Sequence, residues 1–191
     1  NKLTLISYRQ CPCCLPSMSN LPPSKKSRTS PDPMESVSPE QTAMDIKALN
    51  LFSRQNAALG AETTAKLTKM KVLIYGLRGI GVETCKNLAL QGVGAMTLVD
   101  STPTATRDVG VNFFLTLADA LAGSPRADVV APKLRELNPL CKVSTAAALD
   151  DATVLAHSAV VITQPLPLPQ LLALNALCRA NHISFFNAFT G

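Results

Sequence analysis

Tryptophan is missing from the sequence, and six phenylalanines and two tyrosines supply all of its aromatic rings. No apolar run approaches the roughly 20 residues that a membrane-spanning helix needs, and no stretch has the basic start, apolar middle and cleavage site of a secretory signal. The net charge is +5, but residues 55–191 hold eleven Lys and Arg against nine Asp and Glu. This near-neutral part lacks a basic footprint for nucleic acid. We therefore expect neither a membrane nor a nucleic acid as a partner.

Histidine is also scarce: only His157 and His182 occur, and neither belongs to a legible Ser-His-Asp arrangement. Three of the six cysteines crowd into residues 11–14, where adjacent cysteines and the lack of a nearby histidine disfavour a zinc site. Cys85 and Cys178 are predicted to be small core residues rather than nucleophiles. With no paired cysteine pattern, we expect a reduced, intracellular chain that binds no metal.

What the chain does have is an apolar fraction of 47% and one conspicuous stretch, KVLIYGLRGIGVETCKNLALQGVGAMTLVD at residues 71–100. The apolar run at residues 72–75 predicts a buried parallel strand. A turn containing Gly76, Gly79 and Gly81 then leads into a helix. A second apolar strand follows at residues 95–99 and ends at Asp100. This order of strand, glycine turn, helix, strand and acid is typical of a nucleotide-binding unit.

The chemistry of such a unit is simple. Glycines let the backbone approach phosphate, the helix N-terminus offers free N–H groups, and Asp100 can accept a hydrogen bond from a ribose hydroxyl. The spacing here is G-x-x-G-x-G, whereas dehydrogenases have G-x-G-x-x-G. Arg78 also lies in the path by which phosphate would reach the backbone, although a guanidinium can itself bind phosphate. An NAD-dependent oxidoreductase is therefore a weaker alternative.

The rest of the chain continues the alternation of helices and strands. Helices are predicted around residues 49–59, 62–70, 124–138, 151–157 and 167–181, and strands at residues 141–145, 159–163 and 183–186. Pro132 should kink or divide the third of these helices. Buried, non-alternating strands between helices predict an α/β fold: a doubly wound, Rossmann-like, mostly parallel sheet. Because the last strand is apolar, we expect the sheet to be truncated at residue 191 and to continue beyond it.

Residues 1–45 differ in composition, with seven of the fourteen prolines and many serines, and we predict a disordered tail. The basic cluster at residues 24–28, beside Ser30-Pro31 and Ser38-Pro39, fits either a nuclear-import signal or a solvated basic tail. The sequence begins with Asn1 and its first methionine is Met18, so we expect residues 1–17 to be upstream sequence or an artefact. Residues 46–191 form the predicted globular domain.

A resemblance to a known family now becomes specific. LFSRQ at residues 51–55 is followed by VLIYGLRGIGVETCKNL, TLVD, VNFFL and RADVVAPKLRELNP, in that order. This pattern resembles the N-terminal half of ubiquitin-activating enzymes over residues 49–191, and the tail SKKSRTSPDP is similar to their start. The fold implied is the ThiF/MoeB-type adenylation fold. The N-terminal subunits of the SUMO- and Nedd-activating heterodimers are similar too and remain an alternative.

The resemblance implies an inactive adenylation half. The family has two copies of the fold, and the active copy has a further glycine where this chain has Arg78. Its Asn-Leu-Asn-Arg run falls on residues 108–111 here, and its magnesium-binding aspartate has no counterpart in residues 164–170. Arg126 matches a phosphate-contacting lysine but is interpreted as a surface helix residue. We therefore expect Gly76, Gly79, Gly81 and Asp100 to be a vestigial nucleotide site, with ATP and magnesium bound mainly outside this chain.

The resemblance also implies what such a half would contribute to an enzyme that adenylates ubiquitin with ATP and transfers it to a cysteine. The domain would pack against the active adenylation half, in the same or a partner chain, and complete a platform for ubiquitin or a ubiquitin-like protein. Arg54 matches an arginine that reaches the ATP phosphates of the opposite half, so it is the candidate catalytic residue. The family's catalytic cysteine lies beyond residue 191. A cytoplasmic and nuclear location is expected.

Overall fold

A computed structural model describes residues 51–189 of the chain. The described strands are parallel and form one sheet in the order β3-β2-β1-β4-β5. They are β1 (Lys71–Tyr75), β2 (Ala95–Val99), β3 (Lys142–Thr145), β4 (Ala159–Ile162) and β5 (Ser184–Asn187). The chain builds outward from β1 to β3 and then returns to place β4 on the other side of β1. This confirms the predicted doubly wound sheet and puts its switch point between β1 and β4.

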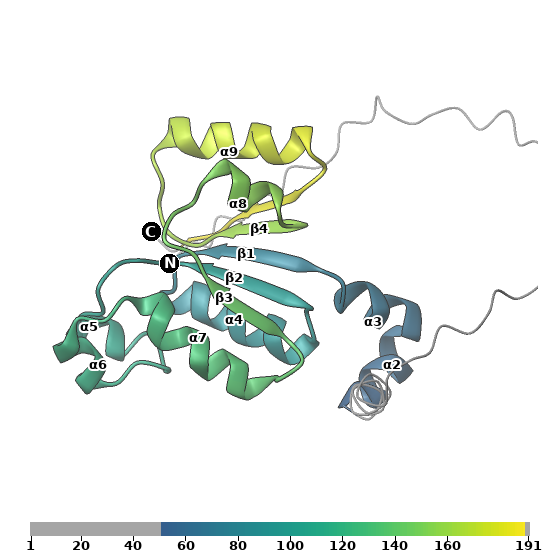
Figure 1. Cartoon of the computed structure of the whole chain (residues 1–191), viewed down its shortest axis with the longest axis horizontal. Helices are drawn as coiled ribbons and strands as arrows, with labels where there is room; N and C mark the ends of the chain where they lie inside the picture. The colour runs from purple at the N-terminus through teal and green to yellow at the C-terminus, as the bar shows by residue number, and fades with distance from the viewer. Residues whose placement is uncertain (1–50, 190–191) are drawn as a thin grey trace, which may run out of the picture.

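Helices cover both faces of the sheet (Figure 1). One face packs against α4 (Gly79–Gln91) and α7 (Arg126–Leu137), and the other against α8 (Asp151–Leu155) and α9 (Leu168–Ala180). Side chains alternate between the faces, so Val72 and Ile74 belong to the first core while Leu73 belongs to the second. Because both faces are buried, the strand sequence is continuously apolar.

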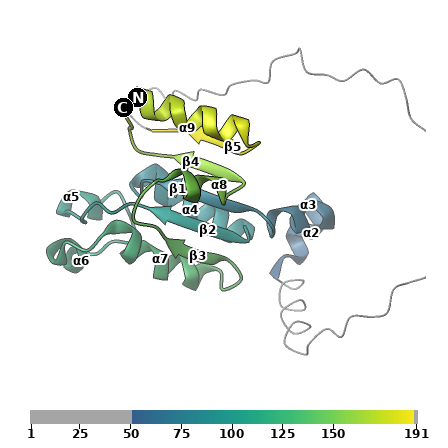
Figure 2. The same cartoon turned by 45° about the horizontal axis from the view of Figure 1, so that its top comes forward.

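Four short helices lie at the two ends of the sheet (Figures 1 and 2). The helices α2 (Ser53–Leu59) and α3 (Ala61–Leu67) precede β1 and lie at the amino ends of the strands. The helices α5 (Thr106–Val109) and α6 (Leu117–Ala122) belong to the connection from β2 to α7, at the carboxyl ends. Within residues 51–189, every helix is too short or too polar to cross a bilayer.

The predicted division of a helix at Pro132 was wrong, whereas the alternative of a kink there stays a prediction. The helix α7 runs unbroken from Arg126 to Leu137 although it contains Pro132. Proline removes the hydrogen bond to the carbonyl of Asp128, but both residues are exposed, so water can satisfy that carbonyl. The predicted core positions of Cys85 and Cys178 were confirmed, since both side chains are fully buried. The predicted tail at residues 1–45 lies outside the described residues.

Candidate functional site

The glycine turn forms at the carboxyl end of β1, as predicted. Gly76 follows Tyr75 with φ +92°, a left-handed conformation that glycine adopts without strain. The helix α4 begins at Gly79, three residues later. A Cβ atom on Gly81 would lie 2.0 Å from the carbonyl oxygen of Gly76, so only glycine lets α4 approach the strand this closely. Gly76 and Gly81 are therefore required by the fold itself, whether or not a nucleotide is bound.

Gln164 occupies the space above the turn. It follows β4 on the other side of the switch point, and a Cβ atom on Gly76 would lie 2.4 Å from its Cγ. The hydroxyl of Thr163, the preceding residue, lies within hydrogen-bond distance of two carbonyl oxygens, those of Tyr75 at 3.0 Å and Gly76 at 2.7 Å, and donates to them. At the amino end of α4, a Cβ atom on Gly79 would lie 3.0 Å from Cγ1 of Val111, which is a tight contact. Side chains of this chain thus fill the surface of the turn.

Asp100 lies at the carboxyl end of β2 and is only 4% exposed. Its Oδ2 accepts hydrogen bonds from the backbone N–H of Leu77 at 2.9 Å, from Arg126 Nη1 at 3.0 Å and from Gln164 Nε2 at 3.0 Å. Its Oδ1 accepts from the N–H of Thr102 at 3.1 Å. Each carboxylate oxygen has about two lone pairs, so the three donors on Oδ2 use that oxygen fully, whereas Oδ1 keeps one lone pair. A ribose hydroxyl would therefore have to reach the remaining lone pair of a carboxylate that is only 4% exposed.

Arg126 is where the structure overturns the sequence interpretation. It was predicted to be a surface residue, yet its side chain is 1% exposed and bridges Asp100 and Asp108. Its Nε lies 3.1 Å from Asp108 Oδ2. Arg126 is the first residue of α7, and that helix starts against the carboxyl end of β2, so the side chain points into the molecule. A buried guanidinium requires such anionic partners.

Asp108 is held as an anion by its surroundings. Burial by itself raises the pKa of this carboxyl, but the N–H of Ala105 and the guanidinium of Arg126 outweigh it and bring the pKa below the ordinary value. Arg78 adds to this effect: its Nε lies 4.0 Å from Asp108 Oδ1, and its side chain is half-exposed. The Arg78 charge is therefore shared with an internal carboxylate at the rim of the turn.

Asn112 ties the connection after β2 to the glycine turn, and sequence reasoning missed it. Its side chain is fully buried, its Nδ2 donates to the carbonyl of Leu77 at 2.9 Å, and its Oδ1 accepts from the N–H of Phe114 at 3.0 Å. A lone asparagine in a polar segment carries no local signal of burial. Only its position against the turn reveals the role.

Arg54 lies at the other end of the sheet from the turn. It is exposed on α2, whereas the neighbouring Phe52 is 5% exposed and packs on Gly92. Gln55 Nε2 also donates to the carbonyl of Gln91 at 2.9 Å. Phe52 and Gln55 are three residues apart and lie on one side of the helix, which anchors α2 to the end of α4. Arg54 is thus presented to the outside and does not approach the turn of its own chain.

Comparison with known proteins now identifies the domain. The model of the ThiF family matches residues 52–164, more than half of the chain. The chain belongs to the ThiF family. The expected resemblance to ubiquitin-activating enzymes is also confirmed. Ubiquitin-activating enzyme E1 1 of Candida albicans is 34% identical over 157 residues, covering 82% of this chain and 15% of the relative. Its counterpart in Schizosaccharomyces pombe is 37% identical over 149 residues, covering 78% and 14%.

The ThiF-family domain is also similar to a solved structure. The Escherichia coli tRNA N6-threonylcarbamoyladenosine dehydratase TcdA, in complex with ATP, superimposes with a TM-score of 0.62 at 23% identity, over 72% of this chain and 58% of the other. At this identity the likeness shows the fold alone. The chain spans about one seventh of the length of the two yeast relatives.

Internal contacts occupy much of the ThiF-family turn. The acceptor expected for a ribose, Asp100, accepts three internal hydrogen bonds at Oδ2, and Gln164 covers Gly76. Within residues 51–189, no group of three or more His, Cys, Asp or Glu side chains is arranged to hold a metal ion. Sequence reasoning placed the glycines and Asp100 correctly but missed the donors that fill the site. The match of Arg126 to a basic residue was the one signal that pointed toward it.

Proposed function

We propose that this ThiF-family domain is the non-catalytic adenylation half of a ubiquitin-activating enzyme. The observation that carries the proposal is the buried Asp100 carboxylate, which accepts hydrogen bonds from four donors of its own chain: Arg126, Gln164, Leu77 and Thr102. A domain that retains the nucleotide-binding fold but fills its acceptor with its own side chains is a scaffold rather than an ATP site. The two yeast relatives, which carry the name ubiquitin-activating enzyme, support the same reading.

In this proposal the domain packs against an active adenylation half and helps to form the platform for ubiquitin or a ubiquitin-like protein. ATP and magnesium are bound by that other half. Arg54 is the residue of this chain that acts in the chemistry. Its exposure on α2, held in place by Phe52 and Gln55, supports a side chain that reaches toward a partner rather than inward. A preorganised guanidinium would stabilise the charge that builds on a phosphate during adenylation.

Titration calorimetry tests the scaffold role. The purified chain should bind neither ATP nor NAD with a dissociation constant below about 100 μM, which corresponds to about −5.5 kcal/mol. Gln164→Ala provides the informative variant, because it uncovers Gly76 and frees one acceptor site of Asp100 while leaving Arg126 in place. Wild-type binding tighter than 100 μM for either nucleotide contradicts the proposal.

The role of Arg54 is tested in the full-length enzyme by ubiquitin-dependent exchange of pyrophosphate into ATP. Arg54→Ala should slow adenylate formation by about 10²–10³-fold, the usual scale for removing one donor to a charged transition state. Arg54→Lys should restore activity only in part, because an ammonium lacks the planar fork of a guanidinium. Gln55→Ala is the matched control for altered anchoring of α2. An Arg54→Ala enzyme that is folded and exchanges at the wild-type rate removes the catalytic role and leaves a structural one.

A further inference from the structure

An open groove runs along the amino ends of the strands, at the end of the sheet opposite the glycine turn. Its first part is a cavity of about 410 Å³, and a second hollow of about 480 Å³ adjoins it. The two parts share Ala95 and Lys142, so they are continuous. The lining residues used below are Phe52, Lys69, Met70, Lys71, Leu140 and Lys142, with Arg135 in the second part. We call this surface the basic groove.

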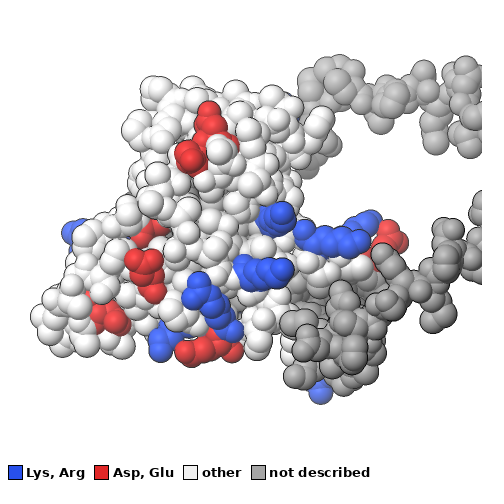
Figure 3. All heavy atoms as spheres, viewed as in Figure 1, with Lys and Arg blue, Asp and Glu red and all other residues white. Residues whose placement is uncertain are grey.

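The charge of the basic groove is of one sign. Lys69, Lys71 and Lys142 line its first part, and its described lining residues include no Asp or Glu. Each of these lysines is exposed, and none has an ion-pair partner among the described residues. Lys71 and Lys142 both pair in register with Ala95, which places them on the same face of the sheet, about 9–10 Å apart. Figure 3 shows basic side chains gathered in this region, near the amino ends of the strands.

Arg135 extends the positive charge along the edge of the sheet. Its Nε and Nη2 donate to the carbonyl of Val143, at 3.0 and 2.8 Å, which holds the guanidinium beside β3. A cation fixed in this way loses little further freedom when a ligand arrives. The groove therefore offers one fixed cation, Arg135, beside three exposed lysines.

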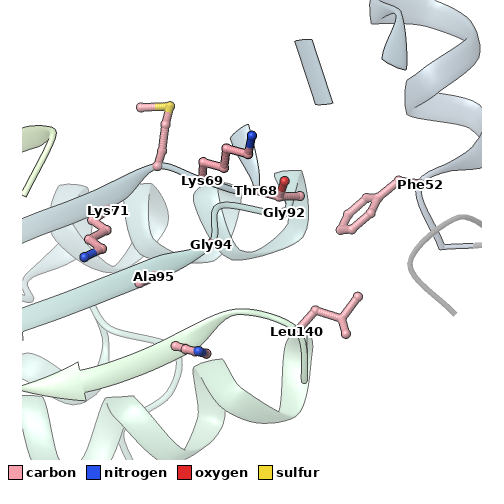
Figure 4. A pocket seen from close by; sticks show the side chains of 10 residues that line it. Phe52, Thr68, Lys69, Lys71, Gly92, Gly94, Ala95 and Leu140 are labelled. Carbon is pink, nitrogen blue, oxygen red and sulfur yellow. The ribbon is translucent and has the colours of Figure 1, made fainter. Parts of the chain in front are cut away.

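The basic groove also has apolar walls. Figure 4 shows Phe52 and Leu140 at one end of the cavity and Lys71 at the other. Met70 contributes a further partly buried apolar side chain. At Gly94 a Cβ atom would lie 2.0 Å from the carbonyl of Thr68, so backbone forms part of the cavity floor. A fitting occupant would carry several carboxylates and a few apolar side chains.

We propose that the basic groove is the docking site of the acidic segment of the same chain, residues 31–45. This segment reads PDPMESVSPEQTAMD, with four acidic residues and no Lys or Arg. It also supplies two methionines and a valine for the apolar walls. Residues 1–30, by contrast, contain five Lys and Arg and no acidic residue. The positive charge of the groove therefore attracts residues 31–45 and repels residues 1–30.

Chain connectivity favours this occupant over a separate protein. Asp45 precedes Phe52, which lines the groove, by seven residues. Seven extended residues span at most about 25 Å, so the segment cannot move far from the lysines. A tether this short gives the segment an effective concentration at the groove in the millimolar range, so that ion pairs that are individually weak can still hold it there. Because such exposed pairs are screened by salt, docking should weaken as ionic strength rises.

Zero-length carbodiimide cross-linking of the intact chain, followed by peptide mapping, tests the proposal. At low salt, amide links should join Glu35 or Glu40 to Lys69, Lys71 or Lys142 within one chain. The links should fall at least fivefold in 0.5 M NaCl. Because Lys71→Glu/Lys142→Glu removes two of the reactive amines, the informative links in that variant are those to Lys69, which should fall by a similar factor.

The matched control is Lys133→Glu, which reverses an exposed lysine of α7 outside the groove and should leave the links unchanged. Circular dichroism checks that each variant is folded. If the double variant is unfolded, a chain with Asp32→Asn, Glu35→Gln, Glu40→Gln and Asp45→Asn replaces it. An added labelled peptide of residues 31–45 should then bind that neutralised chain, whose groove is empty, at least fivefold more tightly than wild type.

Four results would overturn the proposal. Two are the absence of any link between the segment and the chain, and links that form equally with lysines outside the groove. Alternatively, links that form only between two chains, and that disappear on dilution, would make a second copy the occupant. Links to Lys69 within one chain that persist unchanged in Lys71→Glu/Lys142→Glu would equally exclude the groove.

Discussion

Replacing Arg126 with methionine would leave two buried carboxylates without their shared cation. The structure sets the size of the effect: Arg126 lies 3.0 Å from Asp100 and 3.1 Å from Asp108, and all three side chains are nearly excluded from solvent. Breaking a buried pair by removing one partner costs about 3–5 kcal/mol, because the remaining charge is uncompensated. We expect the Arg126→Met loss to lie in this range. Two observations favour a loss in the lower half of this range. Asp100 keeps three other donors, and Arg126 Nη2 has no hydrogen-bond partner among the described residues, so the variant loses no contact there.

Urea unfolding followed by circular dichroism measures this loss. With a slope of about 1–3 kcal/mol per M for a small domain, a loss of about 3–4 kcal/mol lowers the midpoint by roughly 1–4 M at pH 7. Arg126→Lys should recover part of the lost stability, because lysine restores the positive charge but cannot contact Asp100 and Asp108 at once as the guanidinium does. Asp108→Asn in the Arg126→Met background should also recover part of it, and the double-mutant cycle gives the coupling between the two residues. Lys133→Met, at an exposed position of the same helix, is the control.

The pH dependence supplies a sharper check. The pKa of Asp108 in the folded chain lies below its ordinary value, so its contribution to stability is present above about pH 4 and is lost as pH falls through the folded pKa. Arg126 is one cause of that depression. The difference in the free energy of unfolding between wild type and Arg126→Met should therefore be largest at pH 7 and should become smaller below pH 4. A midpoint equal to wild type at pH 7, or a loss that is the same at pH 7 and pH 3.5, would refute the reasoning.

Three further predictions concern the turn, the buried cysteines and the N-terminal segment. Gly81→Ala should destabilise the fold by about 2–4 kcal/mol, because its Cβ atom meets the Gly76 carbonyl at 2.0 Å; a melting temperature equal to wild type would show that α4 shifts easily. Burial raises the pKa of Cys85 and brings the pKa of Cys141 to about 11, so neither should react with a maleimide in the native chain at pH 7.5; mass-spectrometric mapping of labelled sites decides this. Residues 18–45 should carry a fluorescent reporter into the nucleus, and a reporter that stays wholly cytoplasmic would remove the import signal.

The sequence by itself determined the local architecture. Residues 71–100 carry the strand, glycine turn, helix and acid in one continuous stretch, and each is fixed by short-range physics: apolar runs for strands and glycine at a left-handed position. The doubly wound sheet follows, because buried parallel strands require helical crossovers. The helix is not divided at Pro132, because this proline lies on the exposed side of α7. Which side of α7 is exposed depends on the elements that pack against it, and the local sequence does not show this.

Only the tertiary structure decided what the candidate site contains. Asp100 meets Arg126 across 26 residues and Gln164 across 64, and Arg126 meets Asp108 across 18. No local pattern encodes such pairings, because they depend on where three separate loops converge at the carboxyl ends of β1, β2 and β4. Sequence therefore indicated an acid at a nucleotide turn. The fold decided that this acid accepts hydrogen bonds from groups inside the protein, because an unpaired charge is strongly destabilising when it is buried.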